Sequence, residues 1–397
     1  MSNGRDELAY VLINPYTIYK SRTGGVIARL FTRTALDLVA ARMFAPSREL
    51  AEEYASVIVT EKDPAKRRIQ ELIRQYILDN YAPDPQTGRR RRVMMLVFRG
   101  ENAAAKIRAA VGQIEPGRPI AGETIRDTYG DFIVSPDGEV RYFEPAVLAA
   151  PSAEYVPERL KIWAKYSDTD GGLLEGVVHY PPGVTPEQTL VLLKPDNFRF
   201  ASARPGSIVD MISRTGLYII AIKVHHMTVA EAREFYAPVR ERLPALYATL
   251  TGPRARAALE REFGFELPPS AEKTLGEMLA PLAAEHQFNR IVNFMTGHAA
   301  DQEATSDPGK MVALVYEGPD AVAKIRNVLG ATDPRKAAPG TIRRELGQDI
   351  LLNAAHASDT PENARREMEI IKIRENNLKP LVEQFYNCKL QHPKVKS

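Results

Sequence analysis

The feature that most constrains the fold of this chain is a long internal repeat. Residues 98–112 read FRGENAAAKIRAAVG and residues 316–330 read YEGPDAVAKIRNVLG, and each stretch is followed by a Pro-bearing loop and then Thr-Ile-Arg. The order of apolar and amphipathic segments before the two stretches is also the same. A repeat with such a long period indicates duplicated domains rather than a solenoid of short units.

Apolar runs and helical periodicity predict the elements of each domain. Each domain is expected to have strands and helices that alternate with short links, which is typical of an α+β sandwich with a mostly antiparallel sheet. We therefore predict two ferredoxin-like α/β sandwiches, each a four-stranded antiparallel sheet with helices, the second carrying a helical insertion. The predicted strands are 8–16, 36–44 and 93–98, then 189–196, 217–227 and 311–318; the predicted helices are 24–31, 47–54, 61–80 and 101–111, then 205–209, 228–236 and 319–329.

The domain boundaries follow from these elements. We expect a first domain over residues 1–150, a linker over 151–188, and a second domain over 189–371. A C-terminal helix and a basic tail are expected over 372–397. The expected linker contains the only tryptophan of the chain, Trp163, and is interpreted as an ordered connection or a small hairpin.

Composition narrows the class of protein. The chain has 397 residues, 44% of them hydrophobic and 26% charged, with a net charge of +3, which is typical of a soluble globular protein and gives no support for binding to nucleic acid. The single cysteine, Cys388, cannot form an internal disulfide, and no Cys/His set has metal-ligand spacing. The longest apolar runs have the length of strands, and the N-terminus has no signal-peptide core. We expect a cytoplasmic protein without a membrane segment.

One histidine lies in a turn of small residues. The sequence around His356 reads NAAHASD, and Thr360, Pro361 and Glu362 follow as a capping hydroxyl, a proline at the first helical position and an acid in the first turn. A ligand can approach a side chain with such small neighbours. Histidine has an ordinary pKa near ~6.5 and can attack as a neutral nucleophile. Taken alone, the turn is equally consistent with an exposed loop histidine.

The residues upstream of this turn change that interpretation. From about residue 189 to 371, the chain resembles the nucleoside diphosphate kinase family, motif by motif and in order. The motifs are LLKPD, EAREFY, AKIRNVLG, GATDP, PGTIR, NAAHASD and NARREME; they contain, respectively, Lys194, Tyr236, Arg326, Thr332, Arg343, then Asn353 with His356 and Ser358, and finally Glu367.

This resemblance implies a phosphotransferase that acts by a ping-pong mechanism. His356 would accept the γ-phosphoryl group of a nucleoside triphosphate and pass it to a nucleoside diphosphate, with Ser358 and Glu367 orienting the imidazole. Mg²⁺ would arrive bound to the nucleotide rather than in a protein metal site. The nucleotide would be bound by Lys194, Tyr236, Arg326, Thr332, Arg343 and Asn353, with Phe288 as the residue that stacks on the base. Family members are usually oligomers of single domains, so a homo-oligomer is expected.

The chain also departs from the family pattern. In the first domain, Asn14 stands where Lys194 stands in the second, Ile114 replaces Thr332, and Leu148 falls near the position of His356, while Tyr54, Arg108 and Arg126 remain. The first domain is therefore expected to be a degenerate copy without catalysis. The second domain has insertions at about 243–285 and 298–310. These departures keep an alternative open: a non-catalytic nucleotide-binding or scaffold protein built on the same fold.

Overall fold

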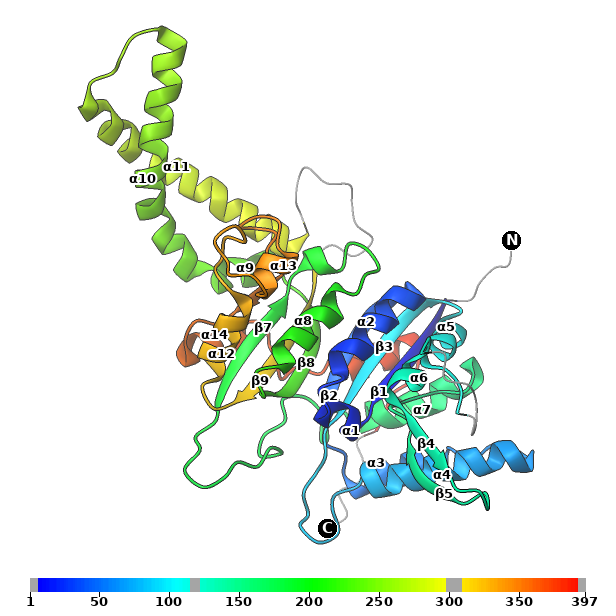
Figure 1. Cartoon of the computed structure of the whole chain (residues 1–397). Coiled ribbons are helices and arrows are strands. Elements are labelled where there is room, and N and C mark those ends of the chain that lie inside the picture. Colours follow the sequence, from blue (N-terminus) through cyan, green and yellow to red (C-terminus); the bar gives the residue numbers. More distant parts are fainter. Residues whose placement is uncertain (1–5, 115–121, 298–308, 392–397) are drawn as a thin grey trace, which may run out of the picture. The chain divides into compact units, whose positions relative to one another are not determined.

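The structure is a computed structural model that describes residues 6–114, 122–297 and 309–391. The chain divides into two compact units. The first unit combines residues 1–224 with 312–397 and contains both sheets; the second is a helical unit of residues 225–311. Figure 1 identifies the elements of both units. No helix in the described part of the chain has the length and apolar character that crossing a membrane requires.

The first sheet has the strand order β2-β3-β1-β6, and all its pairings are antiparallel. Residues 8–13 of its inner strand are buried without alternation, so helices cover both faces of the sheet. A two-stranded hairpin of β4 and β5 follows α6. The elements are β1 (Asp6–Ile13), α1 (Pro15–Tyr19), α2 (Thr23–Thr34), β2 (Asp37–Phe44), α3 (Arg48–Ser56), α4 (Pro64–Asn80), β3 (Val93–Glu101), α5 (Ala103–Val111), α6 (Ile125–Tyr129), β4 (Asp131–Val134), β5 (Val140–Glu144), β6 (Val147–Ala149) and α7 (Val156–Lys165).

The second sheet repeats this topology. Its order, β8-β9-β7-β10, corresponds strand by strand to that of the first sheet, which confirms the predicted pair of four-stranded antiparallel sheets with helices. Helices α8 and α12 pack together, and α14 packs against β7. The elements are β7 (Glu187–Leu193), α8 (Arg204–Ser213), β8 (Tyr218–His226), β9 (Lys310–Gly318), α12 (Ala321–Leu329), α13 (Ile342–Leu346), β10 (Ala355–Ala357), α14 (Pro361–Ile370) and α15 (Leu378–Phe385).

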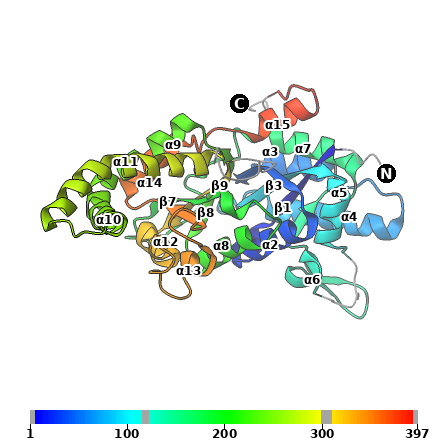
Figure 2. The ribbon, with the colours of Figure 1, turned by 90° about the horizontal axis from the view of Figure 1, so that it is seen from above.

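The two sheets of the first unit are joined through α2 and α8, which lie side by side in Figures 1 and 2. The helices touch at Gly24 and Gly206. A Cβ atom on Gly24 would lie 2.5 Å from the backbone oxygen of Gly206, and one on Gly206 would lie 2.3 Å from the backbone oxygen of Gly24. These distances are too short for any side chain, so the contact requires glycine on both helices.

Substitution of Gly206 tests this packing. We expect Gly206→Ala to lower the free energy of unfolding by about 1–3 kcal/mol, because the added methyl group must push two backbones apart. Chemical denaturation measures the change. The matched control is Ser207→Ala on the next, half-buried position. If Gly206→Ala is no more destabilising than that control, the close helix contact is wrong.

The helical unit consists of α9 (Val229–Phe235), α10 (Ala237–Phe263) and α11 (Pro269–Thr296). Helices α10 and α11 form an antiparallel pair. The two helices approach closely at Gly252, since a Cβ on this residue would lie 2.4 Å from the backbone oxygen of Glu272. The insertion predicted at about 243–285 is helical and lies within this pair. The second predicted insertion, 298–310, lies almost entirely outside the described residues, as does the end of the basic tail.

One domain boundary differs from the prediction. The expected linker over 151–188 begins with α7, whose Trp163 is fully buried. Its ring centroid lies 4.8 Å from that of Phe44, 5.4 Å from that of Tyr54 and 6.0 Å from that of Tyr81. Helix α7 therefore belongs to the core of the first sandwich, which extends past residue 150. Helix α7 follows β6 just as α14 follows β10 in the second sandwich, but the motif comparison that set the boundaries ended the first domain before this helix.

Candidate active site

The histidine turn continues into the edge strand of the second sheet. Ala354 has a φ of 69°, a left-handed conformation that alanine rarely adopts. In the next three residues β10 pairs with β7, and His356 lies directly opposite Leu192. The side chain of His356 is 20% exposed, so a ligand can reach the imidazole while the backbone is fixed by the sheet.

A buried carboxylate orients the imidazole. The His356 Nε2 atom lies 2.9 Å from Glu367 Oε2, and the Ser358 hydroxyl donates to the same oxygen over 2.6 Å. Ser358 and Glu367 are almost entirely buried. Glu367 lies on α14, where the Thr360 hydroxyl accepts from the Asn363 amide as the predicted cap. The structure thus brings together all three residues predicted to be catalytic.

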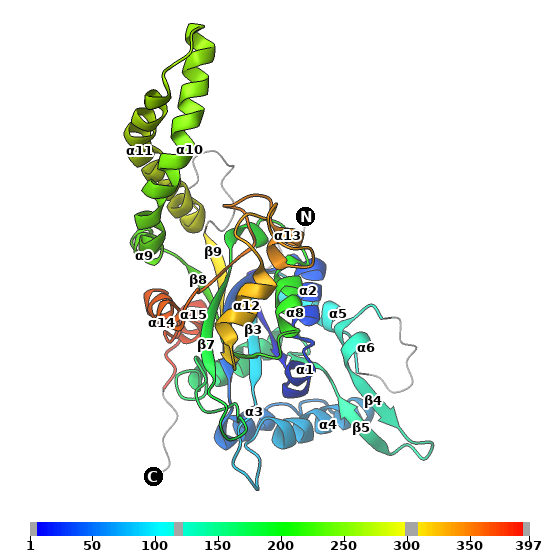
Figure 3. The ribbon, with the colours of Figure 1, turned by 60° about the vertical axis from the view of Figure 1, so that its left-hand side comes forward.

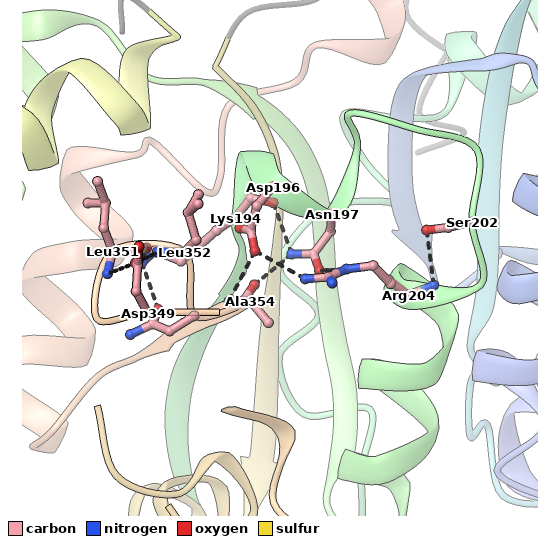
Figure 4. A network of polar contacts seen from close by, with 10 residues as sticks. Lys194, Asp196, Asn197, Ser202, Arg204, Asp349, Leu351, Leu352 and Ala354 are labelled. Atoms are coloured by element: carbon pink, nitrogen blue, oxygen red, sulfur yellow. Dashed lines mark hydrogen bonds and ion pairs between the residues drawn. The ribbon is translucent and has the colours of Figure 1, made fainter. Parts of the chain in front are cut away.

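Lys194 lies at the end of β7, next to the histidine turn (Figure 4). Its ammonium group donates to the Asn353 side-chain oxygen and to the Leu351 carbonyl, both over 2.8 Å. Asn353 in turn donates to the Thr332 carbonyl over 3.1 Å. Burial lowers the pKa of Lys194 to about 8; the Asp196 carboxylate opposes this shift and Arg343 adds to it.

The structure adds three residues that the sequence analysis did not assign: Asp196, Asn197 and Arg204. Asp196 accepts from the Ala354 amide and pairs with Arg204, in both cases over 3.2 Å, and Asn197 donates to the Ala354 carbonyl over 2.6 Å. Figure 4 shows this network around Ala354. Burial raises the pKa of Asp196, although Lys194 and Arg204 oppose the shift. The network holds the strained residue that precedes β10. The signal was present, because Asp196 and Asn197 directly follow the Lys-Pro pair.

The two predicted phosphate-binding arginines are held differently. Arg343 is partly buried and donates to the carbonyls of Gly330 and Ala355, over 3.0 and 3.1 Å. Arg326 lies in the last turn of α12, and its side chain is exposed, as is that of Thr332. Arg343 is thus fixed beside the histidine strand, whereas the two exposed side chains are accessible to a ligand.

The other two predicted nucleotide-binding residues belong to the helical unit. Tyr236, between α9 and α10, is 7% exposed and packs against Phe235. Phe288 on α11 is fully buried, and the guanidinium carbons of Arg233 and Arg240 lie 5.9 and 5.2 Å from its ring centroid. Base stacking by Phe288 remains a prediction, and it requires this ring to become exposed.

The first sheet offers a direct comparison with the site. In it Leu148 pairs with Leu12, just as His356 pairs with Leu192 on the corresponding strands. Ala146 lies two positions before Leu148, just as Ala354 lies two positions before His356. Both alanines have the left-handed conformation, with φ of 59° and 69°. Leucine therefore occupies the histidine position of the first sheet.

The arginine of the Thr-Ile-Arg motif is also held in the same way. Arg126 donates to the carbonyls of Gly112 and Val147, which correspond to the Gly330 and Ala355 partners of Arg343. The lysine position differs. Asn14 donates to Glu144 over 3.1 Å and accepts from the Tyr81 hydroxyl over 2.6 Å, so a buried polar network replaces the ammonium group there.

Within the described ranges, no group of three or more His, Cys, Asp or Glu side chains is placed to hold a metal ion.

Comparison with known proteins covers the second sheet and the helical unit. The family model described as nucleoside diphosphate kinase matches residues 187–252 and 270–376. The nucleoside diphosphate kinase of Chlamydia abortus is 32% identical over 182 residues, which are 46% of this chain and 89% of that protein. That of Helicobacter pylori is also 32% identical over 182 residues, which cover 92% of its length.

Two solved structures of nucleoside diphosphate kinases also align with this chain. The nucleoside diphosphate kinase of Aquifex aeolicus is 28% identical and aligns over 49% of this chain and 99% of its own, with a TM-score of 0.30. An NDP kinase from Pyrobaculum aerophilum is 27% identical over 47% of this chain and 95% of its own, with a TM-score of 0.33.

Proposed function

Because this chain belongs to the nucleoside diphosphate kinase family, we propose that it transfers the γ-phosphoryl group of a nucleoside triphosphate to a nucleoside diphosphate through a phosphohistidine on His356. The observation that carries this proposal is the hydrogen bond from His356 Nε2 to Glu367, which also binds the Ser358 hydroxyl. A partly exposed imidazole with a buried carboxylate behind it is the arrangement that an activated histidine requires.

In the first half-reaction, His356 attacks through Nδ1. A proton on Nε2, donated to Glu367, leaves the Nδ1 lone pair to form a bond with the γ-phosphorus. The bond between that phosphorus and the β–γ bridging oxygen breaks, and the nucleoside diphosphate leaves with the electron pair. Glu367 stabilises the positive charge that develops on the ring. In the second half-reaction, a terminal oxygen of another nucleoside diphosphate attacks the phosphorus and regenerates His356.

The cationic side chains supply the remaining stabilisation. Phosphoryl transfer depends mainly on the positioning and neutralisation of charge on the equatorial oxygens. Lys194, Arg326 and Arg343 are proposed to bind the phosphates, with the Thr332 hydroxyl as a further donor and Asn353 as a ligand of the sugar or the bridging oxygen. Mg²⁺ enters as part of the substrate, bound to the triphosphate. Tyr236 is proposed to bind the nucleotide from the helical unit.

The first sandwich is proposed to be a degenerate copy of the second. Leucine at the histidine position and asparagine at the lysine position remove both the nucleophile and one phosphate cation. Assembly into a homo-oligomer and a cytoplasmic location remain predictions.

A labelled-phosphate experiment tests the proposed function. The full chain is incubated with Mg²⁺ and ATP labelled at the γ-phosphorus. We expect an acid-labile, base-stable phosphoprotein that loses its label when GDP is added and yields labelled GTP. Nucleotide binding without any phosphoprotein would reject the proposal and favour the alternative, a non-catalytic nucleotide-binding or regulatory protein.

Glu367 is expected to act as a positioning residue. Glu367→Gln keeps the shape of the side chain but loses the charge that stabilises the phosphorylated ring, so we expect phosphorylation to slow by about 10- to 100-fold while the phosphoprotein still forms. The affinity for ADP should change little, because the carboxylate acts on the imidazole. Glu369→Gln, at an exposed position of the same helix, is the control. An unchanged rate of phosphorylation in Glu367→Gln would contradict the role.

A further inference from the structure

The first sandwich contains a cavity of about 670 Å³, within the range of small-molecule sites in proteins. It lies at the end of the first sheet that corresponds to the His356 site, because Leu148, Arg108 and Arg126 all line it. Other parts of its wall come from α4 and from the β4–β5 hairpin, which contact each other and appear close together in Figures 1 and 3.

The cavity is positively charged. Arg108, Arg126 and Arg159 line it, and so do Lys66 and Arg68, against one carboxylate among the described lining residues, Glu61. Among the described residues, no carboxylate forms an ion pair with Arg108, Arg126 or Arg159. Excess positive charge of this kind favours an anion as the occupant.

The inner arginines also have unused donors. Arg159 is 3% exposed, and its Nη2 donates to the carbonyls of Val57 and Ile58. In the described part of the chain, the buried Nε atoms of Arg159 and Arg126 have no hydrogen-bond partner. Burial, with the nearby Arg108, lowers the pKa of Arg126 to about 10. A buried donor without a partner is unfavourable, so an anion that draws either guanidinium toward the cavity costs no hydrogen bond of an Nε atom.

The remainder of the lining is apolar. Leu148 occupies the position that corresponds to the polar His356 in the second sheet. Isoleucine, valine and phenylalanine side chains continue the apolar wall along α4 and the hairpin. A sugar placed against this wall would lose the hydrogen bonds of its hydroxyls, whereas a hydrocarbon would gain from burial. The apolar residues are Ile58, Ile69, Ile73, Val111, Ile114, Phe132, Val134, Val140 and Leu148.

We propose that this cavity binds an amphipathic anion, a molecule with a phosphate or carboxylate head held by Arg108, Arg126 and Arg159 and with a hydrocarbon body against the apolar wall. The site is separate from the proposed phosphotransfer site, so its occupant is not a substrate of that reaction. Alkyl phosphates and fatty acids share an anionic head group on a hydrocarbon chain, and the experiment distinguishes these two classes.

The experiment uses the full chain, isothermal titration calorimetry and the fluorescence of the only tryptophan. Trp163 is a suitable reporter because its ring lies 5.4 Å from that of Tyr54, which lines the cavity. The probes are decyl phosphate, decanoate, decanol, inorganic phosphate and GDP, each below its aggregation limit. We expect one or both of the charged decyl compounds to bind and to change the Trp163 emission, and the stronger of the two to identify the preferred head group.

Two variants assign the binding to the cavity. Arg108→Gln removes a charged donor and should weaken binding of the charged decyl probe by about tenfold or more. Ile69→Asp places a carboxylate in the apolar wall and should have a similar effect. Lys106→Gln, on the exposed side of α5 and outside the lining, makes the same charge change as Arg108→Gln and should leave the affinity unaltered. Both Arg108→Gln and Lys106→Gln should retain the wild-type rate of phosphoryl transfer.

Other results would overturn the proposal. Decanol that binds as tightly as decyl phosphate would show that the arginines play no part. GDP binding that depends on Arg108, without binding of either charged decyl probe, would assign the cavity to a nucleotide. Absence of binding by every probe would also reject it. None of these results bears on the labelled-phosphate experiment, so the two proposals can fail independently.

Discussion

His356→Ala is expected to abolish the phosphoprotein and to lower the rate of phosphoryl transfer from ATP to GDP by about a thousandfold or more, because removal of the nucleophile of a covalent mechanism leaves only binding and charge stabilisation. Single-turnover labelling with γ-labelled ATP and a coupled assay of GTP formation measure the two effects. The affinity for ADP should change little, because the imidazole contributes to the chemistry rather than to ground-state binding.

Two controls make this result specific. His179→Ala removes another exposed histidine of the same unit and should keep full activity. In His356→Gly, added imidazole should restore part of the transfer to GDP, because free imidazole can occupy the space left by the side chain. A His356→Ala protein that still forms a base-stable phosphoprotein would place the nucleophile elsewhere.

The second large effect is expected at Lys194. Lys194→Met should lower kcat/KM for Mg-bound ATP by about 10²- to 10³-fold, the usual effect of removing one preorganised donor to a transition state. Because the pKa of Lys194 is lowered from 10.5 to about 8, the wild-type kcat/KM should also fall as the pH rises past 8, where the free protein loses the ammonium charge. Lys194→Arg stays charged and should move this alkaline limb to higher pH.

The same shift has a consequence for stability. The pKa of Lys194 is lower in the folded than in the unfolded chain, so between about pH 8 and 10.5 the unfolded chain binds more protons at this residue. The free energy of unfolding of the wild type should therefore rise relative to that of Lys194→Met across this window. Urea denaturation at pH 7, 9 and 10.5 measures the difference. A constant difference would mean that Lys194 is not perturbed by burial.

Much of the fold was predictable because it depends on local patterns. Apolar runs located three strands of each sheet but not the three-residue edge strands β6 and β10, and the alternation of strands and helices indicated the sandwich. The grouping of His356 with Ser358 and Glu367 was also predictable, because these residues are near in sequence and α14 begins at a recognisable cap. Lys194 required the sheet: β7 and β10 must pair before its ammonium group can reach Asn353.

Other features were not predictable from local patterns. Nothing in the sequence around Trp163 shows that α7 packs into the first sandwich, because the partner rings are contributed by β2, α3 and the end of α4. The aromatic ring of Phe288 favours a stacking role. The same apolar ring is buried between α11 and its neighbours in the folded chain. The roles of Asp196 and Arg204 depend on the strained conformation of Ala354, which composition does not reveal.

The sequence by itself determined that the chain has two related sheets and that the second carries a histidine, a nearby carboxylate and the cations proposed to bind phosphate, because these depend on residue type and order. The tertiary structure decided which residues meet. Strand register placed Leu148 at the histidine position of the first sheet, and packing of α4 and the β4–β5 hairpin left an arginine-lined cavity there. Register and packing are properties of residues far apart in the chain, so only the folded structure could show that the first sandwich has leucine at the position of His356 and a cavity beside it.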